Sequence, residues 1–134
     1  MRVKCQPSVT PLIKGGRKYR LENKVVYEFG HDQKIIIHRG YIFDGASVPK
    51  FLHWFIGPMS PRVVASSLLH DAIYTDPCLL KVASYVVGGR RQPRCFTKKE
   101  ADNFFMAVNK ANNMDSFRTK AAYWAVRLFG RGNF

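Results

Sequence analysis

Residues 60–74 read Ser-Pro-Arg-Val-Val-Ala-Ser-Ser-Leu-Leu-His-Asp-Ala-Ile-Tyr, and at this stretch the chain changes from strand-like to helical patterning. Ser60 suits the N-cap of a helix, and Pro61 suits the first helical position, where a missing N–H and a fixed φ are tolerated. We therefore predict a helix from Pro61 to about Tyr74. This helix places Tyr74 on the same face as His70, one turn later.

The first 45 residues have the composition of β-strands. Val, Ile and Tyr are frequent, and turn signals divide the region into short segments. The segments are Lys18–Leu21, Lys24–Phe29 and Lys34–His38. They predict a hairpin or a three-stranded meander, after which a turn at Phe43–Pro49 breaks the strand pattern.

Residues 49–130 have mainly helical periodicity. Thr97-Lys98-Lys99-Glu100 is a capping box that predicts a helix to about Lys110. A last helix is expected over Ser116–Phe129, ended by Gly130, whereas residues 82–87 also suit a strand. We predict one α+β domain over residues 1–134, in which an N-terminal antiparallel β-sheet in residues 1–45 precedes three or four packed helices.

The composition is that of a packed but strongly basic domain. Lys and Arg number 22 against nine Asp and Glu, which gives a net charge of +13, and 46% of the residues are hydrophobic. An anionic lipid surface, an acidic protein or non-specific nucleic acid would suit this charge, and no sequence-specific nucleic-acid motif accompanies it. No apolar run is long enough for a transmembrane segment, and no export signal is visible.

Three cysteines, Cys5, Cys78 and Cys95, form an odd set without metal-type spacing. This pattern favours reduced, partly buried thiols over a Cys78–Cys95 disulfide.

His70 and Asp102 are candidates for hydrolytic chemistry. A neutral imidazole can take a proton from water when its other nitrogen is held, usually by a carboxylate. Asp102 lies near the start of the next helix and could hold His70, and Tyr74 could orient Asp102 through a hydrogen bond. The alternative is that His70 is a core histidine whose bond to Asp102 is structural.

Asp71 points away from His70 and is a candidate ligand for calcium, which prefers carboxylate and carbonyl oxygens. Backbone carbonyls of the turn at residues 55–59 would complete the set of calcium ligands.

Asp44 and Ser47 lie in the earlier turn at Phe43–Pro49. They either stabilise the backbone of that turn or supply a further ligand or an anion-binding nest. The apolar residues 51–56 suit either the core or a lipid-facing surface, and Tyr123, Trp124 and Phe129 are expected in the core.

His70-Asp71-Ala72-Ile73-Tyr74 resembles the HDxxY helix of secreted-type phospholipases A2, and Phe55-Ile56-Gly57-Pro58-Met59 resembles the calcium loop of the parvoviral capsid version. The resemblance implies that His70 is the base and Asp102 its partner. It also implies calcium ligands at Asp71 and at the carbonyls of Phe55, Gly57 and Met59. Met59 stands where most members have Gly, and Phe55 where they have Tyr.

A longer resemblance extends from about Gly40 to Gly130. Its residues are Phe43-Asp44-Gly45-Ala46-Ser47-Val48-Pro49, Ile56-Gly57-Pro58, His70-Asp71-Ala72-Ile73-Tyr74, Glu100-Ala101-Asp102 and Tyr123-Trp124-Ala125-Val126. This combination is similar to a phage and prophage family known only as a domain of unknown function. It implies a phage protein of the host cytoplasm or the virion.

Two functions follow as hypotheses. The first is a phage-encoded, calcium-dependent hydrolase of lipid or another ester. The second is a non-enzymatic virion, tail or neck protein whose basic surface binds DNA or an acidic partner.

Overall fold

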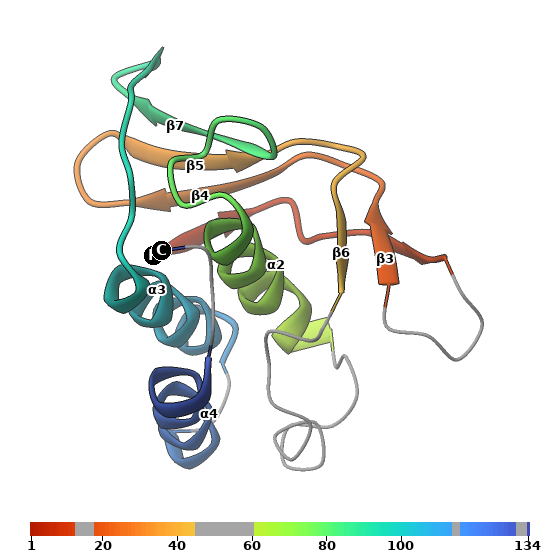
Figure 1. Ribbon diagram of the computed structural model, residues 1–134, viewed down its shortest axis with the longest axis vertical. Coiled ribbons are helices and arrows are strands. Elements are labelled where there is room, and N and C mark those ends of the chain that lie inside the picture. The colour runs from red at the N-terminus through yellow and green to blue at the C-terminus, as the bar shows by residue number, and fades with distance from the viewer. Residues whose placement is uncertain (13–17, 45–60, 114–115, 131–133) are drawn as a thin grey trace.

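The computed structural model describes residues 1–12, 18–44, 61–113, 116–130 and 134, and Figure 1 shows antiparallel strands with the helices gathered on one side of the larger sheet. The strands are β1 (Arg2–Lys4), β2 (Val9–Pro11), β3 (Lys18–Leu21), β4 (Val25–Phe29), β5 (Gln33–Ile37), β6 (Ile42–Asp44), β7 (Ala83–Val87) and β8 (Arg90–Arg91). The helices are α2 (Pro61–Thr75), α3 (Lys98–Ala111) and α4 (Ser116–Phe129). The α+β class is confirmed.

The strands form two sheets. The larger has the order β1-β4-β5-β7-β8, and the smaller has the order β2-β3-β6. The β4–β5 hairpin agrees with the sequence prediction, and Val26 faces Ile36 across it. Side chains at alternate positions of this hairpin are buried, because successive residues of a strand point to opposite faces. These buried residues are Val25, Tyr27, Ile35 and Ile37.

The predicted three-stranded meander does not form, because β3 pairs with β2 and β6 in the smaller sheet. The side chain of Asn23 explains part of the difference. It accepts a hydrogen bond from Ser8 N at 2.7 Å and donates one to Gln6 O at 3.3 Å. These bonds hold the β3–β4 connection against the N-terminal segment, so the connection does not close a tight hairpin.

Residues 49–130 are less uniformly helical than predicted. The ambiguous segment forms β7, which pairs with β5 in the larger sheet, and β8 completes a hairpin with it. Ala83 and Tyr85 of β7 belong to the hydrophobic core, and β7 extends the larger sheet beyond β5. The strand region and the helical region therefore share one sheet.

Helix α2 is the central element of the domain. Every residue from Val64 to Tyr74 is buried, as expected for a helix that is covered on all sides. Leu68, Leu69 and Ile73 belong to the same hydrophobic core as the hairpin strands. The hydroxyl of Tyr27 donates a 2.6 Å hydrogen bond to Ala65 O, which fixes the helix on the sheet.

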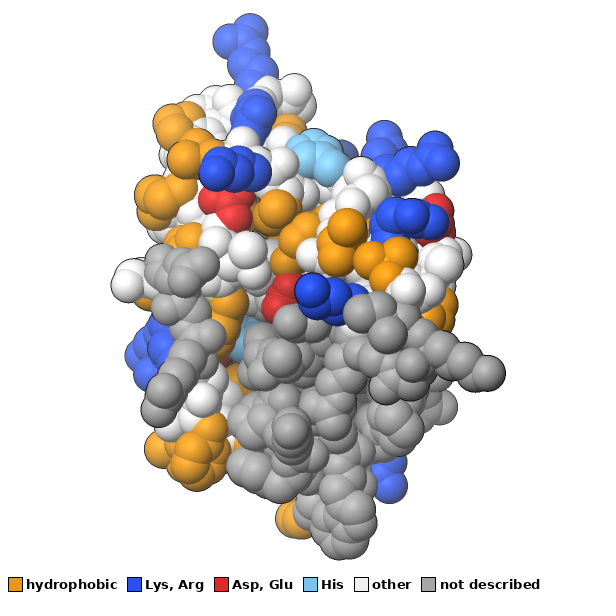
Figure 2. Space-filling model, turned by 45° about the vertical axis from the view of Figure 1, so that its right-hand side comes forward, with side chains coloured by type: hydrophobic (Ala, Val, Ile, Leu, Met, Phe, Trp, Pro, Cys, Tyr) orange, Lys and Arg blue, Asp and Glu red, His pale blue; other side chains and the backbone are white. Residues whose placement is uncertain are grey.

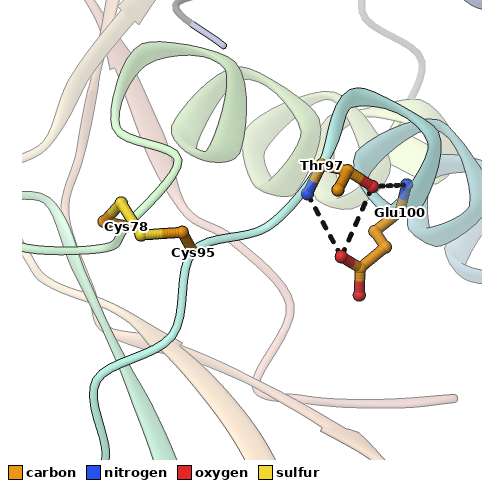
Figure 3. Close-up of a disulfide and its surroundings, with 4 residues drawn as sticks. All are labelled: Cys78, Cys95, Thr97 and Glu100. Atoms are coloured by element: carbon orange, nitrogen blue, oxygen red, sulfur yellow. Dashed lines mark hydrogen bonds between the residues drawn. A yellow bond between two sulfur atoms is a disulfide. The ribbon is translucent and has the colours of Figure 1, made fainter.

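Helices α3 and α4 begin and end close to the predicted residues. Thr97 accepts a hydrogen bond from Glu100 N, and Glu100 accepts one from Thr97 N, so the capping box is formed (Figure 3). In α4, the prediction that Trp124 and Phe129 are core residues is wrong, because each is 59% exposed. The apolar pattern of α4 covers both its inner and its outer side, so periodicity alone does not identify the buried one.

The expectation of reduced thiols is also wrong for two of the three cysteines. Cys78 and Cys95 form a disulfide (Figure 3), whereas Cys5 is free and exposed. Cys78 follows α2 and Cys95 precedes α3, so the bond fixes the end of one helix beside the start of the other. A hydrogen bond of 2.8 Å from Phe96 N to Pro77 O supports the same connection.

Candidate functional site

The structure brings His70, Tyr74 and Asp102 together at the contact between α2 and α3. His70 Nε2 lies 2.7 Å from Asp102 Oδ1, and the hydroxyl of Tyr74 donates to the same oxygen at 2.5 Å. The side chains of His70 and Asp102 are fully buried. Helical spacing explains the arrangement on α2, because residues four apart lie on one face.

Two cations complete the surroundings of Asp102. Lys98 Nζ and Arg127 Nη1 each lie 3.0 Å from Asp102 Oδ2. Lys98 also donates to the carbonyl oxygens of Val126 and Arg127 at 2.9 and 3.0 Å, near the end of α4. The Asp102 carboxylate therefore joins α2, α3 and α4, and each of its oxygens has two donors.

The protonation states follow from these contacts. Burial by itself raises the pKa of Asp102, but hydrogen bonds from His70, Tyr74 and Lys98 outweigh that effect and lower it to about 2. Burial lowers the pKa of His70 below its ordinary value, and the hydrogen bond and charge of Asp102 only partly oppose this. Burial, followed by the nearby carboxylate, raises the pKa of Tyr74. At neutral pH the group is thus an ionised Asp102 beside a neutral His70.

This charge state fixes the tautomer of His70. An ionised carboxylate only accepts hydrogen bonds, so the proton of His70 lies on Nε2 and the lone pair lies on Nδ1. Among the described residues, buried His70 Nδ1 has no hydrogen-bond partner. A buried polar atom without a partner is uncommon in native proteins. His70 therefore presents a basic nitrogen that the described part of the fold does not use.

Asp71, the predicted calcium ligand, lies on a different side of α2. It is 8% exposed, and its Oδ2 accepts a hydrogen bond from the hydroxyl of Tyr41. A hydroxyl in this position orients a carboxylate, as supporting groups do around metal ligands. A carboxylate is the kind of hard oxygen ligand that calcium prefers, and calcium binding at Asp71 stays a prediction. Within the described residues, no cluster of three His, Cys, Asp or Glu side chains is placed to hold a metal.

The other predicted site residues lie in or next to the part of the chain that the structure does not describe. Phe55, Gly57, Met59 and Ser47 fall in residues 45–60, outside the described ranges. Asp44 is the last residue of β6, where its backbone pairs with Lys18. Their proposed roles at the calcium site or in an anion nest stay predictions.

Sequence reasoning missed Lys98, Arg127 and Tyr41. Lys98 precedes Asp102 by four residues on α3, a spacing at which opposite charges meet. This spacing could have been used to predict the Lys98–Asp102 ion pair. Arg127 and Tyr41 had none, because they reach Asp102 and Asp71 from distant elements.

A pocket of about 350 Å³ is lined in part by Tyr41, the residue whose hydroxyl donates a hydrogen bond to Asp71. Two of its lining residues, Arg39 and Lys81, are cationic and none is acidic; the lining consists of His38, Arg39, Gly40, Tyr41, Ile42, Lys81 and Val82. The ring of His38 is held by Ser84, whose Oγ lies 2.9 Å from Nε2. The described side chains in Figure 2 include more basic than acidic groups on the face that is turned forward.

Two antiparallel sheets with a helical layer, and a buried His–Asp pair between two helices, define an α+β protein with a preformed polar centre. Residues 19–126 match the model of a family described as a protein of unknown function (DUF1353), so the chain belongs to this family. No curated protein and no solved structure matches the chain. The resemblance to a domain-of-unknown-function family is thereby confirmed, and the phage origin stays a prediction.

Proposed function

We propose that this chain is a small phage-encoded hydrolase that cleaves an ester, with His70 as the general base. The observation that carries the proposal is the state of His70. Its Nε2 is bound to an ionised Asp102, and its buried Nδ1 is without a partner among the described residues. A held imidazole with a vacant lone pair is the arrangement that general-base catalysis requires.

In the proposed reaction, His70 Nδ1 takes a proton from a water molecule while the water oxygen adds to the carbonyl carbon of the ester. The bond from that carbon to the alcohol oxygen then breaks. The proton passes from His70 to the leaving oxygen, which yields a carboxylic acid and an alcohol. Asp102 stabilises the imidazolium that forms in between, and Tyr74 keeps Asp102 oriented.

Calcium is part of the proposal as the group that would polarise the ester carbonyl when bound. Asp71 would hold it, together with the carbonyls of Phe55, Gly57 and Met59. Asp71 follows His70 directly on α2, so one turn of this helix would supply both the base and a ligand for calcium.

The test is ester hydrolysis by the wild-type protein and by His70→Gln. Suitable substrates are a soluble chromogenic ester and phospholipid vesicles, assayed with calcium and with a chelator. Loss of the base should lower turnover by about 10²–10⁴-fold. The matched control is His31→Gln, which removes a fully exposed histidine from the turn between β4 and β5 and should keep wild-type activity. Circular dichroism melting of each variant shows whether the fold is retained.

A second candidate, a non-enzymatic virion protein with a basic binding surface, is favoured by one observation. His70 and Asp102 are fully buried, which equally suits a structural polar network. In that case wild type would hydrolyse neither substrate, His70→Gln would lower the melting temperature, and the protein would co-purify with phage particles. Turnover that His70→Gln leaves unchanged would contradict the hydrolase proposal.

A further inference from the structure

The outer side of α4 is apolar, although it faces solvent. Phe117, Trp124 and Leu128 are 71%, 59% and 70% exposed. Their spacing of seven and four residues places them on one line along the helix. We call these three residues the α4 stripe. Single exposed apolar residues are ordinary, but an aligned set of large ones marks an interaction surface.

The α4 stripe lies on a firmly held helix. On the opposite side of α4, Thr119, Ala122 and Val126 are buried, and α4 packs against α3. Arg127 and the carbonyl of Val126 are bonded to the Asp102 and Lys98 pair described above. The inner side of the helix is thus used by the fold, and the exposed residues of the stripe lie on the other side.

The charges around the α4 stripe indicate what it contacts. Helix α4 contains the exposed residues Arg118 and Lys120 and no carboxylate, whereas Arg127 is paired with Asp102 on the inner side. The whole chain carries a net charge of +13. Basic residues beside Trp, Phe and Leu are typical of helices that lie in the interface of an anionic membrane. Like charges oppose contact with a second copy of the chain. Nucleic acid would complement the charge, but it offers no match for the aliphatic Leu128.

We propose that the α4 stripe docks on an anionic lipid surface. This inference rests on the proposed hydrolase function in one respect, since it identifies the ester substrate as a lipid in an assembled bilayer. The docked helix, α4, also carries Arg127, which pairs with Asp102 of the candidate site. None of the helices in the described part of the chain is long and apolar enough to cross a membrane, and docking requires only partial burial of one helix face.

The first experiment uses Trp124 as an internal probe. The chain has two tryptophans, Trp54 and Trp124, so Trp54→Phe leaves the one in the α4 stripe. Vesicles of phosphatidylglycerol should shift its emission to the blue, vesicles of phosphatidylcholine should have little effect, and the shift should weaken as salt is added. Co-sedimentation of the wild-type chain with the same vesicles gives an independent measurement.

The second experiment changes the stripe itself. Phe117→Gln combined with Leu128→Gln should weaken partitioning onto phosphatidylglycerol vesicles at least tenfold, because two large apolar side chains no longer enter the interface. Both residues are exposed, so the fold should be retained. The matched control is Leu80→Gln, which removes another leucine, 69% exposed, from the connection between α2 and β7, and should bind like wild type.

Absence of wild-type binding to phosphatidylglycerol, or an equal loss in Leu80→Gln, would overturn the inference. So would a dimer, seen by light scattering, that the double variant dissociates, because the stripe would then belong to a second copy. His70→Gln separates this inference from the hydrolase proposal. It should bind vesicles normally but lack turnover, so vesicle binding without any His70-dependent turnover would refute the hydrolase alone.

Discussion

Asp102 is the residue on which the candidate site is built. Its two oxygens accept hydrogen bonds from His70 and Tyr74 of α2, Lys98 of α3 and Arg127 of α4. Burying an ion is costly unless paired charges and hydrogen bonds compensate, and here both are present. One carboxylate therefore fixes the tautomer of His70 and joins three helices.

Asp71 carries the calcium prediction. We expect wild type to bind calcium with a micromolar to millimolar dissociation constant in isothermal titration, and Asp71→Asn to lose that binding, because an amide supplies no charge. Asp32→Asn is a suitable control, because Asp32 lies in the exposed β4–β5 turn. Equal binding by wild type and Asp71→Asn would show that Asp71 is not a calcium ligand, and no binding by wild type would remove calcium from the proposal; either result leaves Asp71 as a partner of Tyr41.

The lowered pKa of His70 makes the stability of the protein depend on pH. Below an ordinary pKa of about 6.5, the unfolded chain binds a proton at this histidine that the folded chain resists. The free energy of unfolding should therefore be highest above that pH and fall as the pH drops towards 5. Asp102 lowers the free energy of unfolding in a separate, more acidic range. This loss begins near the ordinary pKa of 3.8 and continues as the pH falls through the folded pKa of about 2.

Urea unfolding at a series of pH values measures this effect. His70→Gln should show a smaller decline in stability between pH 7 and 5 than wild type. If removal of His70 leaves the slope unchanged, the histidine is not held neutral by burial.

At the scale of elements, the relation between α2 and α3 decides whether the site exists, because one carries His70 and the other Asp102. The disulfide between Cys78 and Cys95 closes the intervening segment, with a sequence separation of 17. The β7–β8 hairpin lies inside this loop. The bond thus restrains the two helices in the unfolded chain and positions them in the folded one.

Replacing both cysteines, Cys78→Ser with Cys95→Ser, should lower the free energy of unfolding by about 3 kcal/mol, the value expected for a loop of this length. Urea unfolding of the oxidised proteins measures it. Cys5→Ser, which removes the exposed free thiol, should match wild type. A double variant as stable as wild type would show that the helices are held by packing alone.

Elements with local signals were predicted well. The capping box at Thr97 identified the start of α3, since caps act within one turn of the backbone they satisfy. Pro61, expected at the first helical position, begins α2. Gly130 marked the end of α4. An added Cβ there would lie 2.6 Å from the Tyr74 hydroxyl, so this glycine also permits α4 to approach the candidate site.

At the scale of the whole molecule, the net charge can be calculated from the sequence, whereas the pairing of strands into sheets cannot. The charge of +13 follows from composition, and it indicates anionic partners wherever the basic residues lie. Which strands share a sheet does not follow, because pairing β5 with β7 joins residues about 50 positions apart. Local propensity allows such pairing without selecting the partner.

The sequence by itself determined the α+β class, the bounds of α3 and α4, the β4–β5 hairpin and the candidate trio of His70, Tyr74 and Asp102. All of these depend on caps, turns, periodicity and side-chain chemistry, which act over a few residues. The tertiary structure alone decided the split into two sheets, the Cys78–Cys95 bond, the cations around Asp102 and the outward direction of Trp124. Each of these depends on which distant segments pack together, and packing is settled by the burial of the whole chain.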